Sequence, residues 1–345
     1  MLAISLAFAA GAFGLSALCV AGLRNWAAVR MLDIPNARSS HSRPTLRGGG
    51  LGIVIGVLLG AWSLVISRTV RIPLNEIAAL SAGGGMVALV GWLDDIHRLS
   101  YRIRLGVQAI SSAIILISLG DFPAITAPFV GNIHLYPLGI SFALVWIVGL
   151  TNAYNFMDGI DGIAGGQALI AGLGWAIIGF ISGQYFFGLI GVLFAASSLG
   201  FLFYNWPPAR IFMGDVGSAF IGFTLAVLPV IATQRNPRLM VAGTLFVWPF
   251  ICDTTFTLVR RMINKESIFE AHRSHIYQRL VIAGYSHRFV TLIYMGLALI
   301  GTVLALLWYK RAPFVNVAVI VLPIVLFAGL WRFTVRAESR AHSGA

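Results

Sequence analysis

Charge is scarce in this sequence. Only 10% of its 345 residues are Asp, Glu, Lys or Arg, whereas a soluble domain carries about a quarter. Runs such as Gly50–Ser67 and Phe314–Leu330 contain no charged residue at all, and each approaches the ~20 apolar residues that cross a hydrocarbon core. The composition therefore excludes a soluble globular protein and predicts an integral membrane protein.

Cysteine and strand-like alternation are equally scarce. Cys19 and Cys252 are the only cysteines, and both lie in apolar runs, which argues against a disulfide framework or a thiolate metal site. The apolar runs are continuous and lack the alternation of a membrane barrel, so we expect helices. The first run, 2–23, has no basic leader and is longer than a signal-peptide core, which favours a retained span.

The apolar runs predict an all-α, polytopic membrane protein with about eleven transmembrane helices in one domain covering residues 1–345. The expected helices are 2–23, 49–67, 74–92, 105–120, 140–153, 163–181, 186–203, 217–233, 239–259, 289–309 and 314–331.

Basic residues divide the connecting segments into two sets. The segments that follow odd-numbered helices hold 18 of the 24 Lys and Arg residues, and the alternate set holds 6. By the positive-inside rule the first set is cytoplasmic, which places the N-terminus outside and the C-terminus inside. The net charge of +12 also suits anionic substrates at that surface. The expected cytoplasmic segments are 24–48, 93–104, 154–162, 204–216, 260–288 and 332–345.

The first of these segments is basic and ends in three glycines. Arg38, Arg43 and Arg47 stand with His41 and Thr45, and together they supply many hydrogen-bond donors. Glycines would let backbone amides approach a ligand at the start of the next helix. A phosphate site and a solvated basic loop are about equally supported by these residues.

Two adjacent carboxylates, Asp94 and Asp95, end the third expected helix. Acidic side chains at a helix C-terminus oppose the helix dipole, so a purely structural role is disfavoured. Neighbouring carboxylates suit a bound cation or a shared proton.

A second acidic segment follows the fifth expected helix, where Asn152, Asn155, Asp158 and Asp161 recur every three residues. This spacing gives a slowly drifting stripe on a helix. Polar groups at the end of a membrane span are costly unless they bind something, and oxygen ligands near phosphates favour Mg²⁺ over zinc.

Three further features carry weaker signals. Asp215 lies between two glycines at the start of the eighth expected helix, where an N-cap would explain it without any function. His272, Arg273 and His275 could grip a pyrophosphate or form an interfacial basic segment. Asp253 lies within the ninth expected span, where it either serves function or bonds a neighbouring helix.

Taken in order, these motifs resemble the polyprenyl-phosphate N-acetylhexosamine-1-phosphate transferases. That family includes phospho-MurNAc-pentapeptide translocase and the enzymes that initiate O-antigen, enterobacterial common antigen and teichoic acid synthesis. The matching motifs are Asp33-x-Pro35, Arg38-x-x-His41, Pro44-Thr45, Gly48-Gly49, Asp94-Asp95, Asn152-x-x-Asn155-x-x-Asp158-Gly-x-Asp161-Gly, Phe212-Met-Gly-Asp215-x-Gly-Ser218 and the histidine-containing loop.

The resemblance implies a bacterial inner-membrane enzyme, helical around a cytoplasmic cleft, that uses Mg²⁺ (with Mn²⁺ as a substitute). It would transfer a sugar phosphate from a UDP-N-acetylhexosamine to undecaprenyl phosphate and release UMP, with membrane lipid around it, no nucleic-acid partner and a homodimer as one oligomeric state. The implied catalytic residues are Asp94, Asp95 and His275; the implied metal ligands are Asn155 and Asp215; the implied substrate-binding residues are Asn152, Asp158, Asp161 (near the uracil), Arg38, His41, Thr45, Arg47, His272 and Arg273.

One departure from the family pattern concerns the last loop. Many relatives carry His-x-His-His, whereas this sequence has His275-Ile-Tyr-Gln278, so phosphate contacts would be shared with His272 and Arg273. The amino-acid sequences of this loop and of 36–44 are similar to those of the O-antigen-initiating branch. This similarity favours UDP-GlcNAc, or a 6-deoxy sugar nucleotide such as UDP-FucNAc or UDP-QuiNAc, as the donor. The peptidoglycan branch, with UDP-MurNAc-pentapeptide, is the alternative.

Two other classes compete with a transferase of this family. A transporter or lipid flippase would place polar groups near the membrane midplane in repeated halves, whereas the acids here cluster at one end. A CDP-alcohol phosphotransferase would need Ala-Arg after the Asp-Gly pair, which Asp161-Gly-Ile-Ala-Gly165 does not supply.

Overall fold

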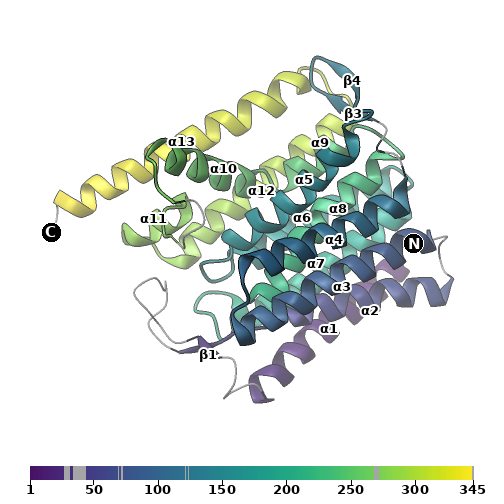
Figure 1. Ribbon diagram of the computed structural model, residues 1–345, viewed down its shortest axis with the longest axis horizontal. Helices are drawn as coiled ribbons and strands as arrows, with labels where there is room; N and C mark the ends of the chain where they lie inside the picture. The colour runs from purple at the N-terminus through teal and green to yellow at the C-terminus, as the bar shows by residue number, and fades with distance from the viewer. Residues whose placement is uncertain are drawn as a thin grey trace.

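The computed structural model describes residues 1–26, 32–33, 44–68, 70, 73–120, 122, 124–267 and 272–343. Long helices lie side by side in one bundle, with the loops gathered at its two ends (Figure 1). Within these described ranges, nine helices are long and apolar enough to cross a membrane. The protein is therefore a multi-pass, all-α membrane protein, as the composition predicts.

Each expected span corresponds to a helix or a helix pair. The helices are α1 (Leu2–Trp26), α2 (Leu51–Ser67), α3 (Leu74–His97), α4 (Tyr101–Leu119), α5 (Gly139–Phe156), α6 (Ile163–Ile181), α7 (Tyr185–Asn205), α8 (Asp215–Thr233), α9 (Leu239–Phe246), α10 (Trp248–Ile263), α11 (Ile276–Ile282), α12 (His287–Tyr309) and α13 (Val315–Ser343).

The prediction of one continuous helix over 239–259 is wrong. The helix is interrupted at Val247, and α9 and α10 are bent by 75° relative to each other. Pro249, in the first turn of α10, has no amide hydrogen to continue the ladder of α9. The carbonyl of Phe246, freed at the break, accepts a hydrogen bond from buried Gln167 (Nε2–O 2.6 Å).

Strands are few and short in the described part of the chain. Residues Leu32–Asp33 (β1) pair with Thr45–Leu46 (β2), and Ala124–Ala127 (β3) pair with Gly131–His134 (β4), both antiparallel. Neither hairpin approaches the length of a membrane strand, so no barrel is formed by these residues.

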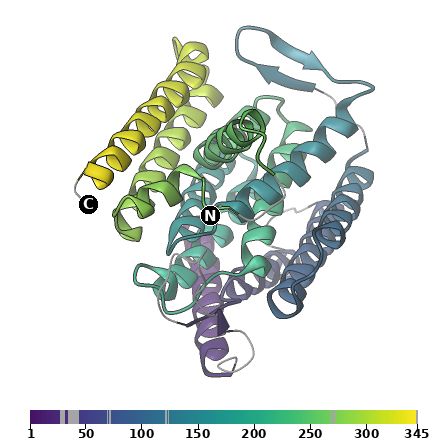
Figure 2. The same ribbon diagram turned by 60° about the vertical axis from the view of Figure 1, so that its left-hand side comes forward.

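Every residue of helix α8 from Val216 to Thr233 is buried, so α8 lies inside the bundle. In the turned view the β3–β4 hairpin projects from one end of this bundle (Figure 2). Close approach of the neighbours of α8 depends on glycine. A Cβ at Gly217 would lie 2.5 Å from the Cα of Gly50, and a Cβ at Gly91 would lie 2.5 Å from the carbonyl oxygen of Asp215. The starts of α2 and α8 and the end of α3 therefore meet at one end of the bundle.

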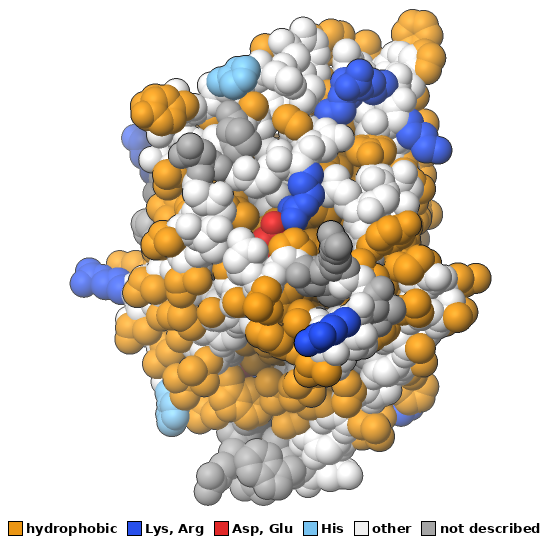
Figure 3. Space-filling view, turned by 90° about the vertical axis from the view of Figure 1, so that its right-hand side faces the viewer, with side chains coloured by type: hydrophobic (Ala, Val, Ile, Leu, Met, Phe, Trp, Pro, Cys, Tyr) orange, Lys and Arg blue, Asp and Glu red, His pale blue; other side chains and the backbone are white. Residues whose placement is uncertain are grey.

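The two ends of the bundle differ in charge. The end where α3 and α5 finish and α8 begins gathers the aspartates discussed below. The β3–β4 hairpin lies at the opposite end (Figure 1). The face on that side shows scattered Lys and Arg side chains and little acidic surface (Figure 3).

Candidate active site

Four helices bring polar side chains to one end of the bundle. The last turn of α3 carries Asp94 and Asp95, the first turns of α4 carry Arg104, the end of α5 carries Asn155, and α8 begins with Asp215. These residues are far apart in sequence but contact one another directly.

Asp95 caps the N-terminus of α8. Its carboxylate accepts hydrogen bonds from the amides of Asp215 (3.0 Å) and Val216 (3.2 Å). The carboxylate that opposes the dipole of its own helix therefore faces the positive end of another, which offsets the cost expected from sequence. Gly214, at φ 76°, leaves room for it, because a Cβ there would collide with the Asp95 carboxylate.

Asp215 is not an N-cap. It is the first residue of α8, and Gly214 occupies the cap position without any side-chain cap bond. The Asp215 carboxylate instead accepts a hydrogen bond from Asn155 Nδ2 (3.0 Å) and lies 3.2 Å from Arg104 Nη1. The same Arg104 nitrogen lies 3.1 Å from Asp94 Oδ2. A single guanidinium thus bridges two aspartates from α3 and α8.

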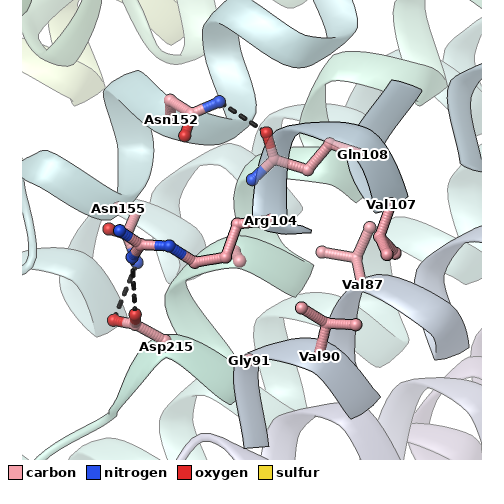
Figure 4. Close-up of a pocket in the computed structure, with 10 residues that line it drawn as sticks. Val87, Val90, Gly91, Arg104, Val107, Gln108, Asn152, Asn155 and Asp215 are labelled. Atoms are coloured by element: carbon pink, nitrogen blue, oxygen red, sulfur yellow. Dashed lines mark hydrogen bonds and ion pairs between the residues drawn. The ribbon is translucent and has the colours of Figure 1, made fainter. Parts of the chain in front are cut away.

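These groups open into a small pocket between the helices. Arg104 extends from α4 across the pocket toward Asn155 and Asp215 (Figure 4). Gln108, one turn further along α4, accepts a hydrogen bond from Asn152 Nδ2 at 2.5 Å. Valines and alanine line the remaining wall: Val87, Val90, Val107 and Ala219. The polar lining therefore comes from α4, α5 and α8, whereas α3 contributes only apolar residues to the pocket wall.

Asp158 lies in the turn after α5, among like charges. Burial, and then the negative charge of Asp215, raise the pKa of this carboxyl to about 8, while the nearby Arg47 guanidinium opposes the shift. The negative charges of Asp95 and Asp161 also raise the pKa of Asp158, by less than Asp215 does. A carboxyl that burial and nearby negative charge keep protonated at neutral pH would ionise beside a bound cation.

Asp161 has different partners from Asn152, Asn155 and Asp158, the other three residues of the predicted stripe. Its carboxylate accepts a hydrogen bond from the amide of Ala209 (3.0 Å) and lies 3.3 Å from His287 Nδ1. The next residue, Gly162, donates its amide to buried Asn205 (2.9 Å). The stripe predicted from the three-residue spacing ends where α5 ends, at Phe156, and the loop carries Asp161 toward α12.

The histidine segment lies directly before α11, with His275 at the N-cap position. His272 Nδ1 is 2.9 Å from Ser274 Oγ, and burial together with the charge of His275 lowers the pKa of His272 to about 4. His275 is buried, with Nδ1 3.3 Å from Asp253 Oδ1. Arg273 is half-buried. At neutral pH the imidazole of His272 is therefore uncharged.

The basic segment before α2 is described only in part. Arg38 and His41 lie outside the described residues. Thr45 lies in β2. Arg47 follows this strand and lies near enough to Asp158 for its positive charge to lower the pKa of that carboxyl. The amides of Gly49 and Gly50 donate to the carbonyls of Phe212 (2.9 Å) and Met213 (2.8 Å). These glycine amides hold α2 against the start of α8, so the expectation that they face a ligand is wrong.

Three residues of this site were missed by the sequence analysis. The sequence places Arg104 in the basic loop before the fourth expected helix, 105–120, and gives it no separate role. The helix in fact begins at Tyr101 and includes Arg104. Arg104 and Gln108 are four residues apart, the spacing that places two side chains on one helix face, and that spacing could have revealed both. Ser218, which accepts from Asn155 Nδ2 at 2.9 Å, carries no comparable signal.

The donor set is compatible with Mg²⁺. Among the described residues, no three His, Cys, Asp or Glu side chains are grouped so as to enclose a metal by themselves. Mg²⁺ is typically held by one or two carboxylates together with substrate phosphates and water. Asp215 and Asn155, side by side at the pocket, supply one carboxylate and one amide.

Comparisons with known proteins agree with these motifs. The profile described as glycosyl transferase family 4 matches residues 77–233. A Bacillus subtilis protein named probable undecaprenyl-phosphate N-acetylglucosaminyl 1-phosphate transferase is 33% identical over 302 residues, covering 85% of this chain and 82% of that protein. This chain belongs to the polyprenyl-phosphate N-acetylhexosamine-1-phosphate transferase family.

Other members of the family are similar over different lengths. The Mycobacterium tuberculosis H37Rv protein named decaprenyl-phosphate N-acetylglucosaminephosphotransferase is 31% identical over 332 residues, covering 86% of this chain and 80% of that protein. The Chlamydia muridarum phospho-N-acetylmuramoyl-pentapeptide-transferase is 35% identical over 212 residues, but these cover only 54% of this chain and 63% of that protein. The acid-rich pocket therefore lies in a membrane-embedded transferase of this family.

Proposed function

We propose that this protein transfers N-acetylhexosamine-1-phosphate from a UDP-sugar to undecaprenyl phosphate at the cytoplasmic face of a bacterial inner membrane. The donor is UDP-GlcNAc or a 6-deoxy relative such as UDP-FucNAc or UDP-QuiNAc, and the product initiates a surface polysaccharide such as O-antigen. The observation that carries this proposal is the convergence of Asp94, Asp95 and Asp215 with Asn155 and Arg104 at one end of a membrane bundle.

The reaction is a substitution at phosphorus. An oxygen of the lipid phosphate forms a bond to the sugar-bearing phosphorus, and the bond from that phosphorus to the bridging oxygen of UMP breaks. Both reactants are anions, so the barrier is largely charge repulsion and positioning. Mg²⁺ bound at Asp215 and Asn155 would supply positive charge at the diphosphate.

Arg104, Asp95 and Asp94 have separate roles in the proposed reaction. Arg104 lies 36% exposed at the pocket, and its guanidinium can exchange an aspartate for a phosphate oxygen. Asp95 fixes the start of α8 and so the direction of the Asp215 side chain. Asp94 remains as the carboxylate beside Arg104 that can keep the lipid phosphate ionised.

The donor branch rests on two supports. The named relatives from Bacillus and Mycobacterium act, by their names, on N-acetylglucosamine phosphate, and each covers most of this chain. The pentapeptide transferase from Chlamydia matches a shorter part, and the one from Lactobacillus helveticus matches 76% of this chain at a lower identity of 28%. The peptidoglycan branch is therefore the second candidate, separated from the first by the donor alone.

The test is UMP release from a panel of donors. Purified protein in detergent with undecaprenyl phosphate and Mg²⁺ should release UMP with UDP-GlcNAc or a 6-deoxy-N-acetylhexosamine donor. It should release little with UDP-MurNAc-pentapeptide. Efficient turnover of the pentapeptide donor would move the protein to the peptidoglycan branch, and no UMP release with any donor would reject the transferase proposal.

A further inference from the structure

Asp253 in α10 is the most heavily hydrogen-bonded buried acid outside the pocket. Its side chain has no solvent exposure. It accepts from the amides of Ile276 (2.9 Å) and Tyr277 (3.2 Å), from the hydroxyls of Thr257 (3.1 Å) and Tyr294 (2.5 Å), and it pairs with His275 Nδ1 (3.3 Å). The donors come from α10, α11 and α12, so this one carboxylate joins three helices.

A buried carboxylate is costly unless it is fully hydrogen-bonded. The two amides belong to the first turn of α11, where the positive end of the helix favours a negative charge. His275 is the residue at the N-cap of α11 and is itself only 3% exposed. The start of α11 is therefore held both by Asp253 and by Gln278, whose side-chain oxygen accepts a hydrogen bond from the amide of His275 (3.3 Å).

The next link runs from α11 to the acid pocket. Tyr277 donates its hydroxyl to the carbonyl of Phe156 (3.0 Å), the last residue of α5. Gly159 packs so tightly against that hydroxyl that a Cβ would collide with it. Asp158 lies between Phe156 and Gly159, so the position of α11 determines the path of the chain that carries Asp158.

A parallel link runs to the histidine segment. The rings of His275 and His272 lie 5.0 Å apart. Arg260, on α10, donates to the carbonyl of Ser274 (3.2 Å), and Ser274 Oγ lies 2.9 Å from His272. Residues 272–275 are thus held between α10 and the fixed start of α11.

We propose that Asp253 and His275 form a positioning pair for the transfer reaction. The pair holds the start of α11, which docks on the end of α5 through Tyr277 and thereby sets the positions of Asp158 and of the His272–Arg273 segment. The proposal rests on the proposed function for its kinetic consequence but not for its structural one. It gives His275 a role through Asp253 instead of direct contact with substrate.

The structural consequence is tested by hydrogen–deuterium exchange on Asp253→Asn. The amide side chain retains the size but loses the charge and one acceptor atom. We expect about tenfold faster exchange at 276–280 and also at 156–160, with α6 and α7 unchanged. Faster exchange confined to 276–280 would overturn the proposal, because it would show that α11 does not set the α5 end.

A milder variant guards against global loosening of the fold. Tyr277→Phe removes only the hydroxyl that reaches Phe156, and we expect it to speed exchange at 156–160 while leaving 276–280 protected. Tyr285→Phe is the matched control, since Tyr285 follows α11 and stacks on Phe289 (5.1 Å). Equal behaviour of the two tyrosine variants at 156–160 would overturn the link.

The kinetic consequence is tested by a double-mutant cycle. Asp253→Asn and His275→Gln should each lower kcat/KM by about 100-fold, with much of the loss in the KM for the UDP-sugar. The kcat/KM of the double variant should be no more than about threefold below that of the worse single variant, because the two residues act through one shared contact. Losses that multiply would show that His275 acts on substrate independently of Asp253 and would reject the pair.

The two proposals fail in different ways. If the unaltered protein releases no UMP, the proposed function falls, but the exchange experiments still decide whether Asp253 positions the α5 end. If the unaltered protein is active and both single variants retain normal kinetics when folded, the positioning pair falls alone.

Discussion

Arg104 and Asp215 illustrate how single side chains define this site. Arg104 Nη1 lies within 3.2 Å of both Asp94 and Asp215, and it is the cation that the structure places between them. Two aspartates so close to one charge would repel each other without it. The same positions suit a divalent ion with substrate phosphates, so in our proposal Arg104 holds the acids together before metal and substrate bind.

The proposed metal role of Asp215 leads to the first prediction. Asp215→Asn removes the charge but keeps the size, and Asp95 still caps α8, so the variant should fold. We expect turnover to fall by about two to three orders of magnitude, since the lost interaction stabilises charge in the transition state. Turnover at varied Mg²⁺, with thermal unfolding as the folding check, measures this.

The control removes a carboxylate away from the pocket. Glu266→Gln acts at an exposed position where the residue pairs with Arg261, and it should leave turnover unchanged. Near-normal turnover of Asp215→Asn at limiting Mg²⁺ would contradict the metal role.

Asp158 leads to a pH prediction. Its carboxyl has a pKa of about 8 in the fold and about 3.9 in an unfolded chain. Because the folded value is raised, the stabilising effect of the bound proton is complete below about pH 4 and is lost as pH rises to about 8. We expect Asp158→Asn, which does not titrate, to gain thermal stability relative to the unaltered protein over that range in EDTA.

Thermal unfolding at pH 5, 7 and 9 without metal measures this difference. The gap should widen from pH 5 to pH 7 and change little beyond about pH 8. Saturating Mg²⁺ should narrow it, since an ion favours the ionised carboxylate. A gap that stays constant across this range would contradict the raised pKa.

At the scale of elements, glycine determines which helices meet at the pocket. Gly217 in α8 lies against Gly50 at the start of α2, and Gly91 in α3 lies against the backbone of Asp215. Backbone-to-backbone approach at these points brings Asp95 within hydrogen-bond distance of the α8 amides. A side chain at either contact would separate the helices that carry the aspartates.

This contact can be tested by a pair of glycine variants. Gly217→Ala would place a Cβ 2.5 Å from the Cα of Gly50 and from the Met213 side chain, so we expect a loss of about 1–3 kcal/mol of stability and a marked loss of turnover. Gly85→Ala in α3 has no neighbour within 4 Å and should be neutral or slightly stabilising. Thermal unfolding and UMP release measure both. Equal effects of the two changes would show that the α2–α8 contact does not matter.

For the whole molecule, the two ends of the bundle face different compartments in our proposal. The end of α13 lies toward one end of the bundle, and the β3–β4 hairpin lies at the other (Figure 1). The acid pocket lies where α3 and α5 finish and α8 begins. The end with the aspartates carries most of the Lys and Arg residues, which favours the cytoplasm. Nucleotide sugars would then reach the pocket directly.

Cysteine labelling tests this orientation. After Cys19 and Cys252 are replaced by Ser, a cysteine at Ser339 on α13 should react only with a reagent that reaches the cytoplasm. A cysteine at His134 on β4 should react only from outside in intact cells; both positions are exposed. The reverse pattern would contradict the proposed sidedness and with it the access of UDP-sugars.

Local composition was enough to predict most of the architecture. Long uncharged runs have few alternatives to a membrane helix, because the bilayer satisfies no backbone polar group. The expected spans were therefore confirmed as helices, apart from the break at Val247, where Pro249 stands in a continuously apolar run. The residue types at Asp94, Asp95, Asn155 and Asp215 also indicated a polar site, since such groups at the end of a span are costly without a partner.

The sequence by itself thus determined the class of the fold and which segments hold polar residues. Only the tertiary structure decided which of them meet. Asp95 caps α8, and Asp215 contacts Arg104 and Asn155. Asp161 pairs with His287, and Asp253 accepts a hydrogen bond from the first turn of α11. Spacing along one helix cannot predict these pairs, because each joins residues from different helices. Their distances depend on how closely glycine allows those helices to pack.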